Sequence, residues 1–578
     1  MRLAGRALGV LAVIAVAIGT MGGRASASDV YAAKLVNLAK RYQTDGFREY
    51  PTSATDAGIH IYDNRLEDFS AASQGQSYRK LRSFRNELAG LLPPVGASTH
   101  DRVDYLLLRS NIENDWWQRT YLKPLSRNPS VYEGECSNGI FSLLKKSFAS
   151  DETRSRDAIA RLRACRNVLA QGKANLTDVV REFAQIASED IGSGDSLYAS
   201  SLDALAEHAQ PTTRARLKLE QTQTLQALHD YKQWIDDHLN TWHAGGFAVG
   251  KVQYNWYLRR VLLLPYDSGQ VQAIGNAALK RDRALEAWEN NRDKYEPKQA
   301  SAPSFKSAAA YLRYYTDQRA HLIVFLNSHQ IVDVPKYLGK FEVVPLPKAL
   351  AATYPGGFMN PPGMFDTDPR GFYFIPYYNP NASGYFAHLS ILPLLGHEGI
   401  PGHFMQFSIA YHNPDYIRHI QGDGVFAEGW AFYGEEMLMR SGLYENDPTA
   451  RKSVIHLMRH RAARVGVDIG LATGEMSLPQ AIRNFMKDGN LDRATAFGEA
   501  TRFAMYPGQA IDYLVGKTQI ETLLGLAQDR DGANFSLRRF HDRLLSYGTV
   551  PLSTIRWEWL NDPSWINRVE EPLAPVSF

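Results

Sequence analysis

The spacing of apolar residues is the sequence feature that most limits how this chain can fold. Between residues 101 and 122, Leu108, Ile112 and Trp116 recur at the interval that gives a helix one apolar face. The same spacing predicts helices over residues 154–172, 175–188, 213–241 and 270–295, with Asp151 and Asp178 as N-caps. Long helices joined by short loops predict a mostly α fold, in which a large helical body surrounds a cleft.

A segment rich in proline and glycine interrupts this pattern between residues 344 and 386. Residues 344–347 and 354–364 contain too many helix breakers to form a helix. Residues 371–375 are aromatic and are flanked by glycine and proline, which predicts a small strand element. The helical pattern resumes near Ala387 and continues to about residue 546, with predicted interruptions at 422–424, Pro448, Gly474 and 507–508.

The N-terminus predicts a secretory signal peptide over residues 1–27. Arg2 and Arg6 precede an apolar run, which is followed by the cleavage pattern Ala25-Ser26-Ala27. A membrane anchor is the alternative, but the run is shorter than the ~20 residues of a spanning helix. Cleavage would remove three arginines and lower the formal net charge from +3 to zero. We therefore expect a secreted or periplasmic bacterial protein, with no net charge to attract nucleic acid or an anionic membrane.

Domain organisation and cysteine usage further limit the class of protein to which this chain can belong. No linker is long enough to divide the chain, so we expect one helical domain over residues 28–578. An arrangement in two lobes, with the site in a lobe over about 340–578, is the alternative. Two cysteines exclude a disulfide-dense scaffold, while Cys136 and Cys165 could form one disulfide in an oxidising compartment. The sequence contains neither a G-x-S-x-G nucleophile elbow nor a G-x-x-x-x-G-K-S/T phosphate loop.

The most informative motif begins with His397 and Glu398. In the zinc-peptidase motif H-E-x-x-H, two histidines one helical turn apart hold the metal and the glutamate acts as the base. Here the second histidine, His403, follows six residues later. On an unbroken helix the two rings would point roughly 120° apart. A helix break at Pro401 and Gly402 would bring them back together. Two unrelated histidines beside a break are the alternative.

Glu428 is the predicted third metal ligand. It lies 25 residues after His403 in an apolar helical run, where a carboxylate needs a partner. Glu435 follows on the same helical face, and we expect it either to bind a substrate amine or to support the metal ligands from behind. An arginine-paired core glutamate at Glu428 and a solvated or salt-bridged one at Glu435 are the alternatives.

These residues belong to a pattern that resembles a known family. The chain is similar to the secreted bacterial family catalogued as domain of unknown function number 885 in four blocks, His397-Glu398-x-x-Pro401-Gly402-His403, Glu428-Gly429-Trp430-Ala431-x-Tyr433, Arg461-x-x-Arg464-x-x-Val467-Asp468-x-Gly470 and Arg502-x-x-x-Tyr506-Pro507-Gly508-Gln509-Ala510-x-x-Tyr513-x-x-Gly516. The resemblance implies a mostly helical protein similar to zinc metallopeptidases of the thimet oligopeptidase and angiotensin-converting enzyme type. The chain departs from the family pattern at Ala472, where the resemblance leads us to expect a histidine.

Two tyrosines and two arginines are predicted to act on the substrate. Peptide hydrolysis develops negative charge on an oxygen, which the hydroxyl of Tyr513, or alternatively of Tyr506, would stabilise. Arg502 and Arg464 could grip a substrate carboxylate with two hydrogen bonds each. Packed aromatic residues are the alternative for the tyrosines.

Two of these assignments have structural alternatives. Arg464 lies four residues before Asp468, which favours an ion pair on the helix surface. Tyr373 lies in the strand predicted over 371–375, whose edge could bind an extended peptide by strand addition. A plain core hairpin is the alternative for this strand.

One hypothesis and two alternatives follow. A secreted zinc metallopeptidase would hold zinc with His397, His403 and Glu428, use Glu398 as general base, and hydrolyse short or extended peptides. The longer histidine spacing motivates the first alternative, a non-catalytic periplasmic binding or scaffold protein with a degenerate metal site. The second is a metal-dependent amidase that acts on cell-wall material. No nucleic-acid partner and no stable membrane anchor are expected.

Overall fold

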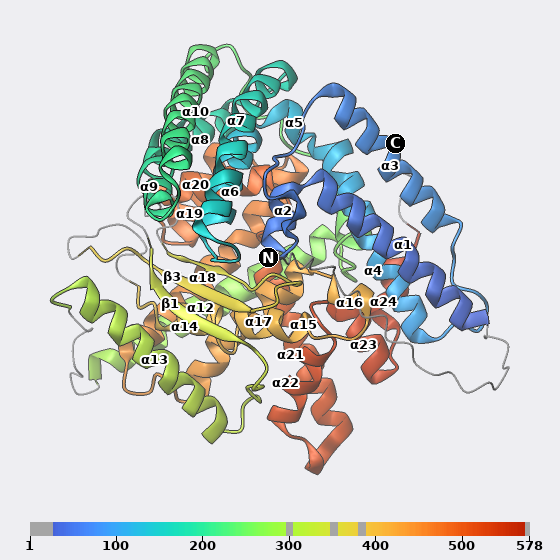
Figure 1. Cartoon of the computed structure of the whole chain (residues 1–578). Coiled ribbons are helices and arrows are strands. Elements are labelled where there is room, and N and C mark those ends of the chain that lie inside the picture. The colour runs from blue at the N-terminus through green and yellow to red at the C-terminus, as the bar shows by residue number, and fades with distance from the viewer. Residues whose placement is uncertain (1–26, 296–304, 347–355, 380–388, 573–578) are drawn as a thin grey trace, which may run out of the picture.

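The computed structural model describes residues 27–295, 305–346, 356–379 and 389–572. Helices dominate, as predicted (Figure 1). Those before the sheet are α1 (Ala27–Glu49), α2 (Pro51–Asp56), α3 (Ala71–Ala89), α4 (Thr99–Trp117), α5 (Pro124–Arg127), α6 (Ser130–Leu144), α7 (Asp151–Asn175), α8 (Arg181–Ser196), α9 (Leu202–Ala206), α10 (Pro211–His238), α11 (Lys251–Arg260), α12 (Ser268–Tyr295) and α13 (Ala308–Ser328).

The remaining helices follow a small sheet. They are α14 (Leu392–Glu398), α15 (His403–Ala410), α16 (Tyr416–His419), α17 (Gly424–Arg440), α18 (Pro448–Thr473), α19 (Leu478–Asp488), α20 (Arg493–Met505), α21 (Asp512–Asp531), α22 (Leu537–Ser546), α23 (Leu552–Leu560) and α24 (Ser564–Glu570). The predicted interruptions at 422–424, Pro448, Gly474 and 507–508 each separate two of these helices. The signal peptide predicted over 1–27 lies almost wholly outside the described residues. Ala387, where the helical pattern was predicted to resume, also lies outside them.

Two predicted N-caps are wrong. Ser150 caps α7, because its hydroxyl accepts a hydrogen bond from a backbone N–H in the first turn, so Asp151 is the first helical residue instead. The helix predicted over 175–188 begins only at residue 181, since α7 itself extends through residue 175. Asp178 therefore lies between the two helices, where its carboxylate is 3.0 Å from Nε2 of His243.

Three short strands form a sheet in the order β1–β3–β2. β1 (Lys340–Pro345) is parallel to β3 (Arg370–Ile375), and β2 (Phe358–Asn360) pairs with β3 in the antiparallel direction. The strand predicted over 371–375 is thus confirmed as β3. Its predicted exposed edge is wrong, because β3 is the central strand and has a partner on each side. β1 and β2 escaped prediction because they are short and border the proline- and glycine-rich segments.

One large apolar core joins the two ends of the chain. It includes Leu35 of α1, Trp117 of α4, Leu326 of α13, Trp430 of α17 and Ile566 of α24. A second apolar cluster is built from residues between 66 and 235, and Figure 1 shows α6 to α10 grouped together above the sheet. In the described part of the chain, no helix is both long and apolar enough to cross a membrane.

A disulfide fastens two helices of the second cluster. Cys136 of α6 and Cys165 of α7 are bonded, and their Cα atoms are 5.3 Å apart. Both side chains are buried among the apolar residues of that cluster. The pairing that the sequence left open is therefore present.

Two glycines let α17 and α21 approach each other closely. A Cβ added to Gly516 of α21 would lie 1.9 Å from the carbonyl oxygen of Val425 in α17. A Cβ added to Gly429 of α17 would lie 2.5 Å from the Cα of Gly516. Because these neighbours are backbone atoms, neither position can accept a side chain without moving a helix. This contact sets α21 directly beside the helix that carries Glu428.

We expect Gly516→Ala to lower the free energy of unfolding by about 1–3 kcal/mol, the usual cost of overpacking a tight contact. Gly525→Ala in the same helix is the matched control, since a Cβ there meets nothing within 4 Å. Alanine should stabilise that position by roughly 0.5–1 kcal/mol, because it lowers the entropy lost on helix formation. Thermal unfolding midpoints check both signs. Equal midpoints for the two variants would contradict the close approach.

Candidate metal centre

The chain leaves the helical conformation directly after Glu398, between α14 and α15. Gly402 is essential to this break, because a Cβ there would lie 1.9 Å from the carbonyl oxygen of His397. Trp430 of α17 holds the break by donating its indole N–H to the carbonyl oxygen of Pro401 at 2.7 Å. The next helix then starts with His403. The break expected from the Pro-Gly pair is therefore present and is anchored by a neighbouring helix.

This break brings His397 and His403 together with Glu428 of α17. Nε2 of His397 lies 3.5 Å and Nε2 of His403 lies 3.3 Å from Oε2 of Glu428. One ligand atom from each residue lies within 4.8 Å of the others. Within the described part of the chain, this Glu428 oxygen is shielded from solvent and has no partner in hydrogen-bond geometry. The three predicted ligands thus converge and could hold a metal ion.

The electrostatics of the centre favour positive charge. Burial alone would raise the pKa of Glu428, but the charges of His403 and His397, which lie 3.3 and 3.5 Å from its Oε2, lower that pKa well below its ordinary value. Burial would likewise lower the pKa of His397, yet its contacts with Glu428 and Glu435 raise it to about 9. The carboxylates therefore attract a proton or another cation between them.

Glu435 lies behind His397 and is fully buried. Its Oε1 is 2.7 Å from Nδ1 of His397. The guanidinium of Arg461 contacts the two carboxylate oxygens of Glu435 at 2.9 and 3.2 Å. The predicted contact with a substrate amine is therefore wrong, since both oxygens are already bonded and out of reach. With Oε1 of Glu435 beside Nδ1, the Nε2 atom of His397 faces the centre, which fits the supporting role given for Glu435, and the ion pair with Arg461 matches its salt-bridged alternative.

Glu398 follows His397 but is not among the converging ligands. Burial raises the pKa of its carboxyl, while the charges of His397 and His403 oppose that rise. These interactions show that the Glu398 carboxyl lies near the candidate ligands. A carboxylate in this position could exchange a proton with a group at the centre.

Tyr513 of α21 is the predicted tyrosine that lies against the candidate ligands. Its ring stacks on that of His397 with centroids 6.4 Å apart, and the residue is only 8% exposed. Burial and the charge of Glu428 raise its pKa far above the ordinary value, so its hydroxyl keeps its proton. Tyr506, the alternative, is 50% exposed just beyond the end of α20, and burial raises its pKa although the charge of Arg502 opposes that rise.

Asp468 of α18 positions the start of α21. Its carboxylate accepts hydrogen bonds from the backbone N–H groups of Gly508 and Ala510 at 2.9 Å, and from the hydroxyl of Tyr254 at 2.8 Å. The surface ion pair predicted between Arg464 and Asp468 is therefore wrong, because Asp468 is fully buried and holds a turn of the chain. The turn leads directly into the helix of the stacked tyrosine.

Arg464 and Arg502 share the carboxylate of Glu499. Nε of Arg464 lies 2.7 Å from one oxygen of Glu499, and Nη2 of Arg502 lies 2.8 Å from the other. The guanidinium of Arg464 also lies over the ring of Tyr513, 5.0 Å from its centroid. The side chain of Arg464 is 10% exposed and that of Arg502 is 38% exposed. Both predicted arginines thus belong to one cluster next to Tyr513.

Tyr373 does not line a cleft. It is fully buried in β3, and its hydroxyl lies 3.4 Å from the carbonyl oxygen of Gly356. The predicted substrate contact is therefore wrong, and the alternative of a core strand is correct. Alternation along the strand places Tyr373 and Ile375 on the buried face of the sheet.

Sequence reasoning missed the roles of Arg461, Glu499 and Trp430. The sequence does contain a hint of the role of Arg461, because a glutamate such as Glu435 in an apolar helical run needs a cation. That cation lies 26 residues away on another helix, where a linear pattern cannot single it out. Glu499 and Trp430 have no comparable signal, since their partners are brought together by packing.

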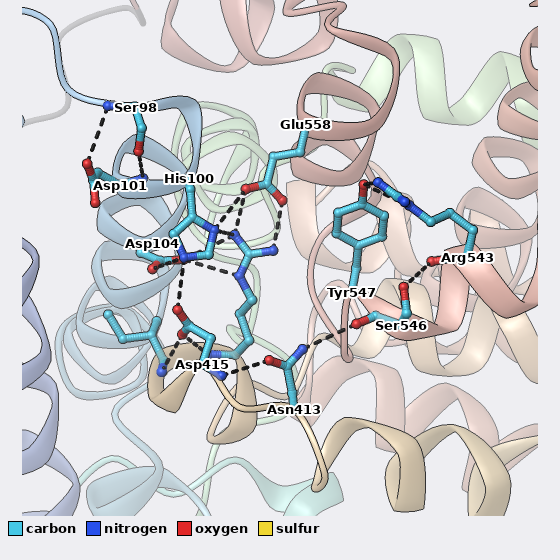
Figure 2. A network of polar contacts seen from close by, with 12 residues as sticks. Ser98, His100, Asp101, Asp104, Asn413, Asp415, Arg543, Ser546, Tyr547 and Glu558 are labelled. Atoms are coloured by element: carbon cyan, nitrogen blue, oxygen red, sulfur yellow. Dashed lines mark hydrogen bonds and ion pairs between the residues drawn. The ribbon is translucent and has the colours of Figure 1, made fainter. Parts of the chain in front are cut away.

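A second group of possible ligands already contains a cation. His100, Asp104 and Asp415 each offer an atom within 4.8 Å of the others, and Figure 2 shows them with Glu558. The guanidinium of Arg418 lies 3.2 Å from Asp104 and 2.7 Å from Glu558. Arg418 therefore neutralises these acids, and the network joins α4, α16 and α23.

This network predicts a pH dependence of stability. Hydrogen bonds to Asp415 and Glu558 raise the pKa of His100 to about 10, against burial and Arg418. A raised pKa means that the stabilisation is complete below pH ~6.5 and is lost as the pH rises from there to about 10, the pKa of His100 in the folded protein. We expect the difference in denaturation midpoint between the wild type and His100→Asn to shrink from pH 6 to pH 10. A constant difference would show that His100 does not carry charge in this network.

The fold and the centre together define a mostly helical protein with a His–His–Glu group whose two histidines are buried. Residues 51–558 match the model of the family described as bacterial protein of unknown function (DUF885). The chain belongs to this family, as its four sequence blocks suggest. A search of curated proteins finds no match.

Two solved structures share the fold. One is a predicted lipoprotein of unknown function from Shewanella oneidensis, with a TM-score of 0.70, 20% identity, and coverage of 93% of this chain and 100% of that one. The other is a predicted lipoprotein from Colwellia psychrerythraea, with a TM-score of 0.76, 20% identity, and coverage of 92% and 99%. At this identity the likeness concerns the fold alone.

Proposed function

We propose that this protein is a zinc-dependent metallopeptidase that is exported from the bacterial cell and hydrolyses short or extended peptides. The convergence of His397, His403 and Glu428 across a broken helix is the observation that carries the proposal. The side chain of Glu428 is 22% exposed, whereas those of His397 and His403 are 5% and 9% exposed. Export is proposed from the N-terminal sequence.

The spacing of the ligand atoms supports zinc. A tetrahedral zinc ion with bonds of about 2.0–2.1 Å places its ligand atoms about 3.3–3.4 Å apart. The distances from Glu428 Oε2 to Nε2 of His403 and of His397 are 3.3 and 3.5 Å. Charge-assisted hydrogen bonds are shorter, about 2.7–2.9 Å. The donor set of two imidazoles and one carboxylate also suits zinc and leaves a fourth position for substrate.

The surrounding residues suit peptide hydrolysis. Zinc, when bound, would supply Lewis-acid polarisation of the peptide carbonyl. Glu398 would accept a proton from the attacking water and return it to the leaving amine. Tyr513 keeps its hydroxyl proton and could donate a hydrogen bond to the oxygen that becomes negative. Glu435 and Arg461 would hold His397 in the orientation that this chemistry needs.

Two features favour an active enzyme over a non-catalytic binding or scaffold protein. Glu398 directly follows a candidate ligand and interacts electrostatically with both histidines, and a metal-binding scaffold would not need such a carboxylate. The buried pair of Glu435 and Arg461 behind His397 is expensive to maintain unless the histidine must be oriented. Nothing in the centre specifically favours an amidase on cell-wall material.

Metal removal tests the proposal. We expect protein purified without chelator to contain about one zinc per chain and to cleave peptides from a mixed peptide library, with products read by mass spectrometry. Chelation should abolish cleavage, and one equivalent of zinc should restore it, whereas magnesium should not. A chain that binds zinc tightly but cleaves no peptide would overturn the proposed activity and favour the binding protein.

A further inference from the structure

A positively charged cluster adjoins the candidate centre. The ring of Tyr513 lies against His397 on one side, with centroids 6.4 Å apart. On another side it lies 5.0 Å from the guanidinium of Arg464. Glu499 then joins Arg464 to Arg502. Arg502 is thus separated from a candidate metal ligand by only a few contacting side chains.

This cluster holds more positive than negative charge. The one carboxylate of Glu499 faces the guanidinium groups of both Arg464 and Arg502. His460 also contacts Glu499, at 3.2 Å. Burial and the charge of Arg464 lower the pKa of His460 to about 4, so it adds no charge at neutral pH. One unit of positive charge therefore exceeds what Glu499 can neutralise.

The excess charge is presented by Arg502. Arg464 is 10% exposed and directs both Nε and Nη2 to the same oxygen of Glu499, at 2.7 Å each. Arg502 is 38% exposed, and its one hydrogen bond within the described residues runs from Nη2 to Glu499. The ring of Phe503, 4.7 Å away, supports its guanidinium. Arg502 thus keeps a fork of N–H donors that could meet a planar carboxylate with two parallel hydrogen bonds.

We infer that Arg502 binds the free C-terminal carboxylate of the substrate, so that the peptidase removes residues from the C-terminal end of peptides. The inference rests on the proposed function, which it makes more specific. Every unmodified peptide has this carboxylate, whatever its side chains, and its position relative to the last peptide bonds is fixed. An anchor near the centre would therefore choose the cleaved bond by its distance from the end of the chain.

Matched peptides test this inference. Blocked tetrapeptides with the same sequence are prepared as the free acid and as the C-terminal amide, together with an amide whose last residue is glutamate. We expect the zinc-loaded wild type to cleave the free acid with a kcat/KM about 10- to 100-fold above that of the plain amide, as expected for a charged hydrogen bond. Mass spectrometry should find the cleavage next to the C-terminus.

Variants then assign the preference to one side chain. Arg502→Ala should lower kcat/KM for the free acid far more than kcat/KM for the amide, so that the preference for the acid disappears. Arg502→Lys, which keeps the charge but loses the fork, should restore only part of the preference. Arg493→Ala is the matched control, because Arg493 is an exposed arginine at the start of the same helix. It should behave as the wild type.

The outcomes separate this inference from the peptidase proposal. Equal cleavage of acid and amide by the wild type, or a preference that survives Arg502→Ala, overturns the carboxylate anchor and leaves the peptidase intact. Preference for the amide ending in glutamate over the free acid also overturns it, since a side-chain carboxylate is then the ligand. If the zinc-loaded wild type cleaves nothing, the peptidase proposal fails. In that case, binding of the two peptides to the Glu398→Gln protein tests the anchor. Tighter binding of the acid than of the amide supports the anchor, and equal binding contradicts it.

Discussion

Replacing Glu398 with glutamine is expected to remove most peptide hydrolysis and to leave the metal in place. The amide has the shape of the carboxylate but cannot accept the proton of the attacking water. A positioned general base contributes about 10²- to 10⁴-fold to the rate, and kcat/KM should fall by that factor. The measurement is kcat/KM of zinc-loaded protein, with the zinc content determined by mass spectrometry on the same sample.

Glu475→Gln is the control for this substitution. Glu475 is exposed and pairs with Lys251 outside the centre, so the same chemical change there should leave the rate unaltered. If Glu398→Gln retains the parental rate with one zinc bound, the base has been assigned to the wrong residue. If it loses zinc as well as activity, Glu398 belongs to the metal ligands rather than to the proton transfer.

Replacing Glu428 with glutamine is expected to have the opposite effect on the metal. This change removes the one anionic ligand and should weaken zinc binding by more than about 100-fold, beyond the loss that supporting residues typically cause. At a zinc concentration 100 times the wild-type Kd, binding stabilises the wild type by about 2.7 kcal/mol. A variant with a Kd raised 100-fold would gain only about 0.4 kcal/mol under the same conditions.

Thermal unfolding with and without zinc measures this difference. The midpoint of the wild type should rise when zinc is added, and that of Glu428→Gln should hardly move. Without zinc, Glu428→Gln should unfold somewhat below the wild type, because the amide loses the charge contacts of Glu428 with His397 and His403. The zinc-induced rise of each protein is therefore measured from its own zinc-free midpoint. An equal zinc-induced rise in both proteins would remove Glu428 from the ligand set. The two glutamine variants together separate metal binding from proton transfer.

Much of the helical architecture could be predicted from local patterns. The apolar spacing around Ile112 and Trp116 and the breaks at Pro448 and Gly474 act over a few residues, so they are visible in the sequence. The same holds for the break between His397 and His403, where proline and glycine prevent a regular helix. The first residues of the helices were harder to predict, because Ser150 and Asp151 are both residue types that cap helices, and only Ser150 caps α7.

Contacts between distant segments could not be predicted in this way. β3 looked like an edge strand in the sequence, but its two partners come from segments without a strand pattern. Arg464 and Asp468 are four residues apart, the spacing of an ion pair on a helix surface. In the folded chain the carboxylate of Asp468 instead accepts a hydrogen bond from the backbone of Gly508. Glu435 gained a buried arginine from another helix. Each of these outcomes depends on which helix faces which.

The residue pattern was sufficient to locate the candidate metal ligands and the helix break between them, since both follow from residue type and from spacing along one chain. The roles of Glu435, Tyr373 and Arg502 depended on how the helices and the sheet pack. Burial and charge pairing arise between segments that are far apart in sequence. A linear pattern carries no information about those distances, and so the surroundings of the ligands emerged only with the folded chain.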